Sequence, residues 1–245
     1  MTLCLPPESS LSAPLMRQRL RQFASGEKAI ILQRFFKTGP GQYGEGDRFL
    51  GIVTPDIRLV AKECRDAPLA AIRKLLRSMW HEERLLALLI LVGRFERGDA
   101  RIQKKICDLY LRSARFINNW DLVDLTAPKI VGPFLADKPR APLYRLAASE
   151  NLWERRIAIL ATFHFIRRGD FTDTLAISGL LLRDREDLLH KAVGWMLRET
   201  GKRDSAVLEG FLRKHYAALP RTTLRYAIER FPEPKRKQYL EGTAL

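Results

Sequence analysis

The 245-residue chain carries 43 Lys and Arg residues against 28 Asp and Glu residues, for a formal net charge of +15. With 46% hydrophobic and 29% charged residues, it is predicted to bury a substantial core, which excludes a disordered tail. Its pI near 10.1 favours a nucleic-acid partner over a merely soluble basic protein. The three cysteines are widely spaced and lack a C-x-x-C motif, which excludes a disulfide framework and a zinc site.

The N-terminal segment and the apolar runs indicate a cytoplasmic protein. Residues 1–14 (MTLCLPPESSLSAP) are predicted to be irregular, and they lack the basic region and the long apolar stretch of a signal peptide. The run LLALLILV at 85–92 is far too short to span a membrane. We therefore expect no membrane partner.

Apolar residues recur at helical spacing along most of the chain, and no run alternates with the period of a strand. Helices are predicted wherever this spacing is clear, and Gly and Pro mark the breaks between them. The clearest periodic segments are 15–24, 69–79, 84–95 and 206–219. The sequence thus predicts an all-α fold.

A glycine-rich loop at 37–48 contains the string GPGQYG at 39–44, which matches G-x-G-x-x-G. A dinucleotide-binding fingerprint needs a strand before the glycines and a helix N-terminus after them. Here a predicted helix (ILQRFFK) precedes them and Glu45-Gly46-Asp47 follows. We therefore interpret this segment as a connecting loop, with no cofactor.

Tryptophans repeat at a roughly regular interval along the chain. Trp80, Trp120 and Trp153 each lie at the start of a charged helical segment, at spacings of 40 and 33 residues. Second amphipathic helices are predicted between them, for example at 102–113 and 171–182. Helix pairs repeating every 33–40 residues are typical of HEAT-like repeats, which stack into a superhelix. We predict one domain over residues 1–245, with a concave basic face.

The charged helices carry the candidate site residues. Residues three or four apart share a helix face, which places Trp120 beside Asp124 and Trp153 beside Arg156. Further stripes of the same kind are formed by Lys191, Trp195 and Arg198, and by Arg221 with Arg225. The same residues could instead have purely structural roles. Tryptophans at helical spacing are often core residues, Asp–Arg pairs often form ladders between stacked helices, and an acid such as Asp121 often stabilises a helix N-terminus.

The chain resembles the AlkD-type DNA alkylation repair glycosylases, which are built from HEAT-like repeats, over roughly residues 15–240. The resemblance is carried by FLGI (49–52), NNWDLVD (118–124), NLWERRIAI (151–159), HKAVGWMLRE (190–199) and RYAIERF (225–231). The glycine-rich residues at 37–47 depart from the shorter members of the family. The resemblance implies that the substrate is double-stranded DNA containing cationic alkylated purines.

The resemblance also implies roles for individual residues. Asp124, four residues after Trp120, matches the catalytic acid, and Trp195 matches the aromatic residue beside the sugar of the lesion. Arg156 matches an arginine that contacts the DNA backbone. With the cationic face, we assign phosphate contacts to Arg156, Lys191, Arg198, Arg221 and Arg225.

The resemblance implies a monofunctional glycosylase, and together with these residues it predicts simple hydrolysis by a monomer, without a metal ion or organic cofactor. No lysine lies in a setting typical of a Schiff base, and the four histidines lack metal-ligand spacing. The alternatives are a non-catalytic HEAT-like protein that binds distorted or branched DNA, and a basic scaffold for protein or RNA. An Asp124 side chain that points into the helix stack and is locked to a neighbouring arginine, away from the basic face, would overturn the glycosylase hypothesis and leave a non-catalytic DNA-binding protein.

Overall fold

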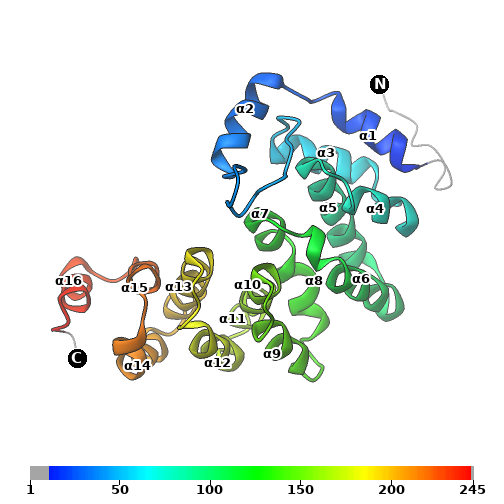
Figure 1. Cartoon of the computed structure of the whole chain (residues 1–245). Coiled ribbons are helices and arrows are strands. Elements are labelled where there is room, and N and C mark those ends of the chain that lie inside the picture. The colour runs from blue at the N-terminus through cyan, green and yellow to red at the C-terminus, as the bar shows by residue number, and fades with distance from the viewer. Residues whose placement is uncertain (1–10, 244–245) are drawn as a thin grey trace. The chain divides into compact units, whose positions relative to one another are not determined.

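The computed structural model describes residues 11–243, and every regular element within them is a helix (Figure 1). An isolated bridge between Arg48 and Trp80 is the one β-type pairing in that range. The predicted all-α fold is therefore confirmed. The chain divides into two compact units, Met1–Leu122 and Val123–Leu245. The single domain and its concave basic face stay predictions.

Within residues 11–122, the first unit contains six full helices, a short 3-10 helix and the beginning of a seventh helix. They are α1 (Ala13–Arg21), α2 (Gly26–Phe35), α3 (Thr54–Glu63), α4 (Leu69–Leu76), α5 (His81–Arg97), α6 (Ala100–Arg112), the 3-10 helix η2 (Ala114–Phe116) and α7 (Trp120–Asp124). The predicted boundary of the irregular N-terminal segment is wrong, because α1 already begins at Ala13 after a Ser12 cap. Residues 1–10 of that segment lie outside the described residues.

Helix α5 forms the core of the first unit. It packs against α3, α4 and α6, and leucines such as Leu86 and Leu91 along it are completely buried. Its first turn is also buried although its residues are charged, namely His81, Glu82, Glu83 and Arg84. Buried charges need partners, and those partners organise the site described below.

The second unit begins at Val123, within α7, and continues the helical series. Its elements are α8 (Ala127–Phe134), α9 (Ala141–Ala147), α10 (Leu152–Ala161), α11 (Phe163–Ile166), α12 (Thr172–Leu181), α13 (Asp187–Gly201), α14 (Ser205–His215), the 3-10 helix η3 (Tyr216–Ala218), α15 (Arg221–Ala227) and α16 (Glu233–Glu241). Helix α13 packs against α10, α12, α14 and α15. Gly194 permits the close approach of α15, because a Cβ atom there would lie 2.5 Å from Tyr226 Cβ.

Polar contacts between successive repeats recur at a nearly constant sequence separation. In the second unit, Arg156 donates to the carbonyl of Leu188, 32 residues later. The Thr223 hydroxyl donates to the carbonyl of His190, 33 residues earlier. In the first unit, His81 contacts Asp121 after 40 residues. These intervals match the repeat length predicted from the tryptophan spacing.

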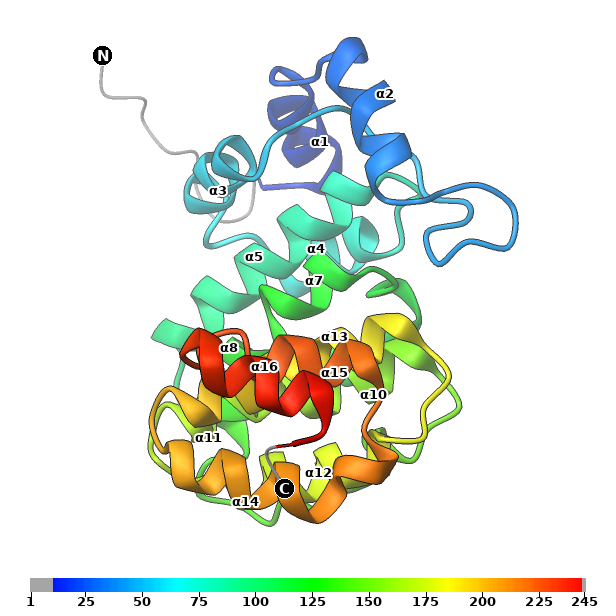
Figure 2. The ribbon, with the colours of Figure 1, turned by 90° about the vertical axis from the view of Figure 1, so that its left-hand side faces the viewer.

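The glycine-rich segment is a loop that follows α2, as the sequence predicts, and it projects beyond the end of that helix (Figure 2). Gly41 and Gly46 adopt positive φ angles of 73° and 83°, which favour glycine. The loop is followed by extended chain that leads to α3. Within residues 11–243, no strand precedes this loop and no helix directly follows it. The loop therefore lacks the structural setting of a dinucleotide-binding fingerprint.

Candidate functional site

The buried start of α5 fixes the FLGI segment. The Glu82 carboxylate accepts hydrogen bonds from the backbone amides of Leu50, Gly51 and Ile52 at 2.9–3.2 Å. Gly51 has a φ of 79°, and a Cβ atom there would lie 2.0 Å from the Ser25 carbonyl oxygen. Only glycine fits this turn, so the connection between α2 and α3 has a defined path.

Asp47, at the end of the glycine-rich loop, is the centre of a buried charge network. Its carboxylate accepts from Arg84 Nη2 at 2.7 Å and contacts His81 Nδ1 at 3.3 Å. The side-chain amides of Asn118 and Asn119 each donate to it at 3.3 Å. Burial alone would raise the pKa of Asp47, but its hydrogen bond to His81 and the charge of Arg84 lower the pKa on balance.

His81 bridges Asp47 and Asp121. Its Nε2 atom lies 2.8 Å from Asp121 Oδ2, and the ring is 2% exposed. Burial lowers the pKa of His81. The charge and hydrogen bond of Asp121 and the hydrogen bond of Asp47 outweigh this effect and raise the pKa from 6.5 to about 9. His81 is therefore a buried cation near neutral pH. Asp121, predicted only to stabilise the N-terminus of its helix, is thus also the ion-pair partner of His81.

Trp120 rests against an aromatic cluster built from α2 and the glycine-rich loop. Its ring stacks on Phe36 at 5.3 Å and meets Phe35 edge-on at 6.0 Å. The indole Nε1–H donates to the Tyr43 hydroxyl at 3.2 Å. Phe36 in turn stacks on Phe49. The loop thus supplies Tyr43 to hold Trp120 and Asp47 to anchor α5.

Asp124 shares the short helix α7 with Trp120, as predicted. Within the second unit, it pairs with an arginine of α10. Arg156 Nε and Nη2 donate to its two carboxylate oxygens, each at 2.8 Å. The side chain of Asp124 is 13% exposed and that of Arg156 is 5% exposed. The third guanidinium nitrogen, Nη1, donates to the Leu188 carbonyl. Arg156 is therefore buried and paired with Asp124, and its contact with the DNA backbone stays a prediction.

The neighbouring arginine of α10 makes a similar pair. Arg155 Nε donates to Asp184 Oδ2 at 2.7 Å, and its Nη2 donates to Asp184 Oδ1 at 3.4 Å. Arg155 also donates to the carbonyls of Ser149 and Glu150. Two consecutive arginines thus each bind an aspartate, and only the partner of Arg156 lies on α7.

The remaining candidates lie on α13 and α15. Trp195 is half-buried, with its ring 6.2 Å from that of Phe163. Lys191 pairs with Asp187 at 2.8 Å, one turn earlier, and Arg198 pairs with Glu229. Arg221 is exposed and donates to the Leu240 carbonyl at 3.0 Å, and Arg225 is exposed as well. The roles of all four cations in DNA binding stay predictions.

Sequence reasoning missed the network around Asp47, His81 and Arg84. A signal was present, since the segment WHEER places four charged or ionisable residues in one turn directly before an apolar helix. Their partners could not be read from spacing, because Asp47 lies 34 residues before His81 and Asp121 lies 40 residues after it.

Other classes of site find no support within residues 11–243. No group of three His, Cys, Asp or Glu side chains in that range could hold a metal ion. None of its helices is long and apolar enough to cross a membrane. Cys64 and Cys107 are both buried.

Comparison with known proteins relates this geometry to a family. The family described as DNA alkylation repair enzyme matches residues 16–231. A solved structure, a predicted DNA alkylation repair enzyme from Enterococcus faecalis, is similar with a TM-score of 0.66 and 17% sequence identity. The similarity covers 86% of this chain and 97% of that one, and at this identity it concerns the fold alone. No curated protein matches.

Proposed function

Because the chain belongs to the DNA alkylation repair enzyme family, we propose that it hydrolyses the N-glycosidic bond of cationic alkylated purines in double-stranded DNA. One observation carries the proposal. The carboxylate of Asp124 lies on the same short helix as Trp120, and Arg156 holds its two oxygens at 2.8 Å. A carboxylate held in one orientation suits the stabilisation of charge that develops on a sugar.

The chemistry of the substrate explains why an acid would belong in so basic a protein. Alkylation at N3 or N7 makes the purine cationic, so the base leaves with the bonding electron pair and becomes neutral. The sugar then carries positive charge, and water adds to C1′ while releasing a proton. A carboxylate about 4 Å from that charge would contribute about 4 kcal/mol at an effective dielectric constant near 20, equivalent to about a thousandfold in rate.

Arg156 both limits and supports this role of Asp124. Its positive charge opposes the field of the carboxylate, so the stabilisation falls below the value for an isolated acid. The two-point pair also fixes the carboxylate, and fixed groups stabilise a transition state without reorganisation. The pair uses two of the roughly four acceptor positions of a carboxylate. We therefore assign Arg156 as a positioning residue for Asp124.

The tryptophans and the exposed arginines complete the proposed site. Trp120 and Trp195 would present electron-rich ring faces to a cationic base or sugar, each contributing about 0.5–2 kcal/mol. Arg221 and Arg225, which are exposed on α15, would bind backbone phosphates. Hydrolysis in this form requires no metal ion or organic cofactor.

The test compares two aspartates that each pair with an arginine of α10. Asp124→Asn is expected to lower the release of 7-methylguanine from methylated duplex DNA by up to about a thousandfold, the value for an isolated carboxylate, with DNA affinity unchanged or higher. Asp184→Asn removes the partner of Arg155 and serves as the matched control, so it should retain near wild-type release. Equal release by Asp124→Asn and wild type would remove Asp124 from the mechanism.

The similarity of these two ion pairs favours a second candidate function. The Asp124–Arg156 pair could serve only to join neighbouring segments of the fold, like Asp184–Arg155. In that case the protein binds distorted or branched DNA without releasing a base. Wild-type protein would then bind alkylated duplexes but release no base. In that case Asp124→Asn and Asp184→Asn would lower the free energy of unfolding by similar amounts and have no other effect.

A further inference from the structure

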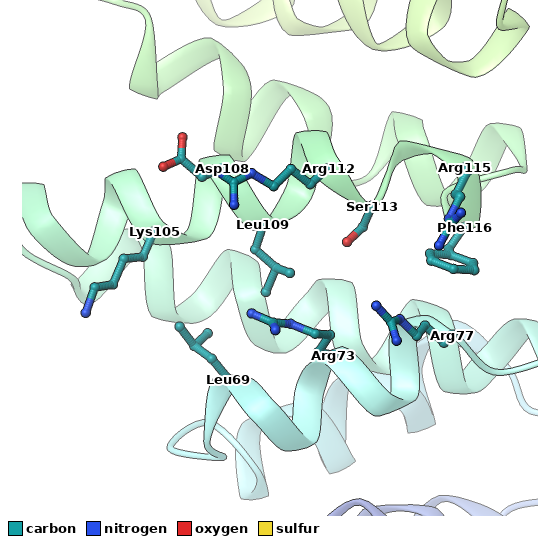
Figure 3. Close-up of a pocket in the computed structure, with 10 residues that line it drawn as sticks. All are labelled: Leu69, Arg73, Arg77, Lys105, Asp108, Leu109, Arg112, Ser113, Arg115 and Phe116. Carbon is teal, nitrogen blue, oxygen red and sulfur yellow. The ribbon is translucent and has the colours of Figure 1, made fainter.

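A basic pocket lies in the first unit between α4 and α6 (Figure 3). Its volume is about 390 Å³, within the size range of small-ligand sites. Its lining residues are Leu69, Arg73, Arg77, Lys105, Asp108, Leu109, Arg112, Ser113, Arg115 and Phe116. None of the residues proposed for base release is among them.

The pocket follows from the way that two amphipathic helices pack on α5. Both α4 and α6 contact α5, and the buried residues of α4, such as Ile72 and Leu76, form its inner face. Positions 69, 73 and 77 are spaced by four residues and form another face of the same helix. Leu109 and Ser113, which are buried, supply an uncharged wall.

The charges of this pocket are unbalanced. Five cations line it, and all five are exposed, namely Arg73, Arg77, Lys105, Arg112 and Arg115. The single acid, Asp108, pairs at 2.7 Å with Lys104, which lies outside the lining. In Figure 3 its carboxylate points away from Arg73 and Arg77. Among residues 11–243, none of the five cations makes an ion pair.

An aromatic ring lies at one end of this cationic pocket. The guanidinium of Arg115 lies 4.6 Å from the centre of the Phe116 ring, and that of Arg77 lies 6.0 Å from it. Figure 3 shows Arg115 directly against the ring. Aromatic and guanidinium planes together form a surface on which a nucleobase can stack.

We propose that this pocket binds a phosphate-bearing nucleotide. Arg73, Arg77 and Arg112 would bind the phosphate oxygens, because the guanidinium group matches phosphate with two parallel hydrogen bonds. Phe116 and Arg115 would contact the base. The same chemistry is offered by a free nucleoside triphosphate and by the backbone of a single DNA strand. Like charges at i and i+4, as in Arg73 and Arg77, destabilise a helix, and a bound phosphate removes that repulsion.

The experiment measures binding of two fluorescent probes to the full chain, a labelled nucleoside triphosphate and a labelled short single-stranded DNA. The pocket variant is the double substitution Arg73→Ala with Arg112→Ala. Its matched control is Lys74→Ala with Arg101→Ala, which removes two exposed charges from the same helices outside the lining. All four side chains are exposed, so both variants should fold, and circular dichroism checks this.

The pocket variant should bind at least one probe about a hundredfold more weakly, since each charge-assisted contact is worth about a factor of ten. The control should stay close to wild type. The probe that distinguishes the two variants identifies the source of the phosphate. Equal loss in both variants, or no binding of either probe by the wild type, overturns the proposal. Release of 7-methylguanine, measured in parallel, should be unchanged by both variants and reports separately on the proposed function.

Discussion

Two regions of the first unit use charge in opposite ways. Around Asp47, cations and acids are buried and paired, with His81 and Arg84 both in contact with one carboxylate. In the basic pocket between α4 and α6, five exposed cations lie beside the uncharged residues Leu109 and Ser113. Paired buried charges specify the fold, because each loses water and needs its partner. Unpaired exposed charges do not stabilise the fold, which is why they indicate a ligand.

The largest expected effect comes from breaking the buried network at its centre. Asp47→Ala would leave His81 and Arg84 buried without their shared carboxylate, and removing one partner of a buried pair costs about 3–5 kcal/mol. Denaturant unfolding followed by circular dichroism measures the loss. Asp108→Ala, which breaks only the pair with Lys104 near the surface, is the control and should cost less than about 1 kcal/mol. Equal losses would erase the distinction between the two regions.

The buried cation of the network predicts a pH dependence of stability. The pKa of His81 rises from 6.5 to about 9 on folding, so its contribution is fully present below pH 6.5. That contribution is lost as the pH rises from 6.5 through 9, and it amounts to a few kcal/mol, since each pKa unit corresponds to about 1.4 kcal/mol. Denaturant unfolding at a series of pH values measures the slope.

His81→Gln is the control for this pH dependence, because glutamine keeps hydrogen-bonding groups but does not titrate. The variant should be less stable than wild type at pH 6.5 and should show a flatter profile between 6.5 and 9. A wild-type profile that is already flat over this interval would contradict a charged His81.

The aromatic cluster beside the network provides a smaller effect. Tyr43→Phe removes the acceptor of the Trp120 indole N–H and should lower the free energy of unfolding by about 1 kcal/mol. Tryptophan fluorescence would shift if the ring gains freedom. The proposed base release should also fall, since Trp120 would be held less firmly. An unchanged rate of release would show that the hydrogen bond from Trp120 to Tyr43 is not needed for base release.

The smallest effect should have the opposite sign and comes from the basic pocket. Arg73→Ala relieves the repulsion with Arg77 one turn away and should raise the free energy of unfolding by a few tenths of a kcal/mol at low salt. Added salt should reduce the gain by screening the repulsion. Precise thermal unfolding at two ionic strengths measures it. A loss of stability would show that Arg73 has a structural partner and no need of a ligand.

The helices and the repeat period were predictable from sequence because their causes are local. Apolar spacing and caps act over a few residues, so α5, α6 and α12 lie close to the predicted segments. The glycine-rich loop was also predictable as a connection. Its contacts were not predictable, because Tyr43 and Asp47 act on partners more than 30 residues away. The placement of Trp120 and Asp124 on one helix was likewise a local inference.

By itself the sequence determined an all-helical repeat, a strong positive charge and the motifs shared with DNA alkylation repair enzymes. Only the tertiary structure decided which charges are paired. Arg155 and Arg156 are adjacent, yet one binds Asp184 and the other Asp124, because consecutive helical residues point about 100° apart. The acid that each arginine contacts depends on how segments about 30 residues away pack, and no local pattern encodes that packing.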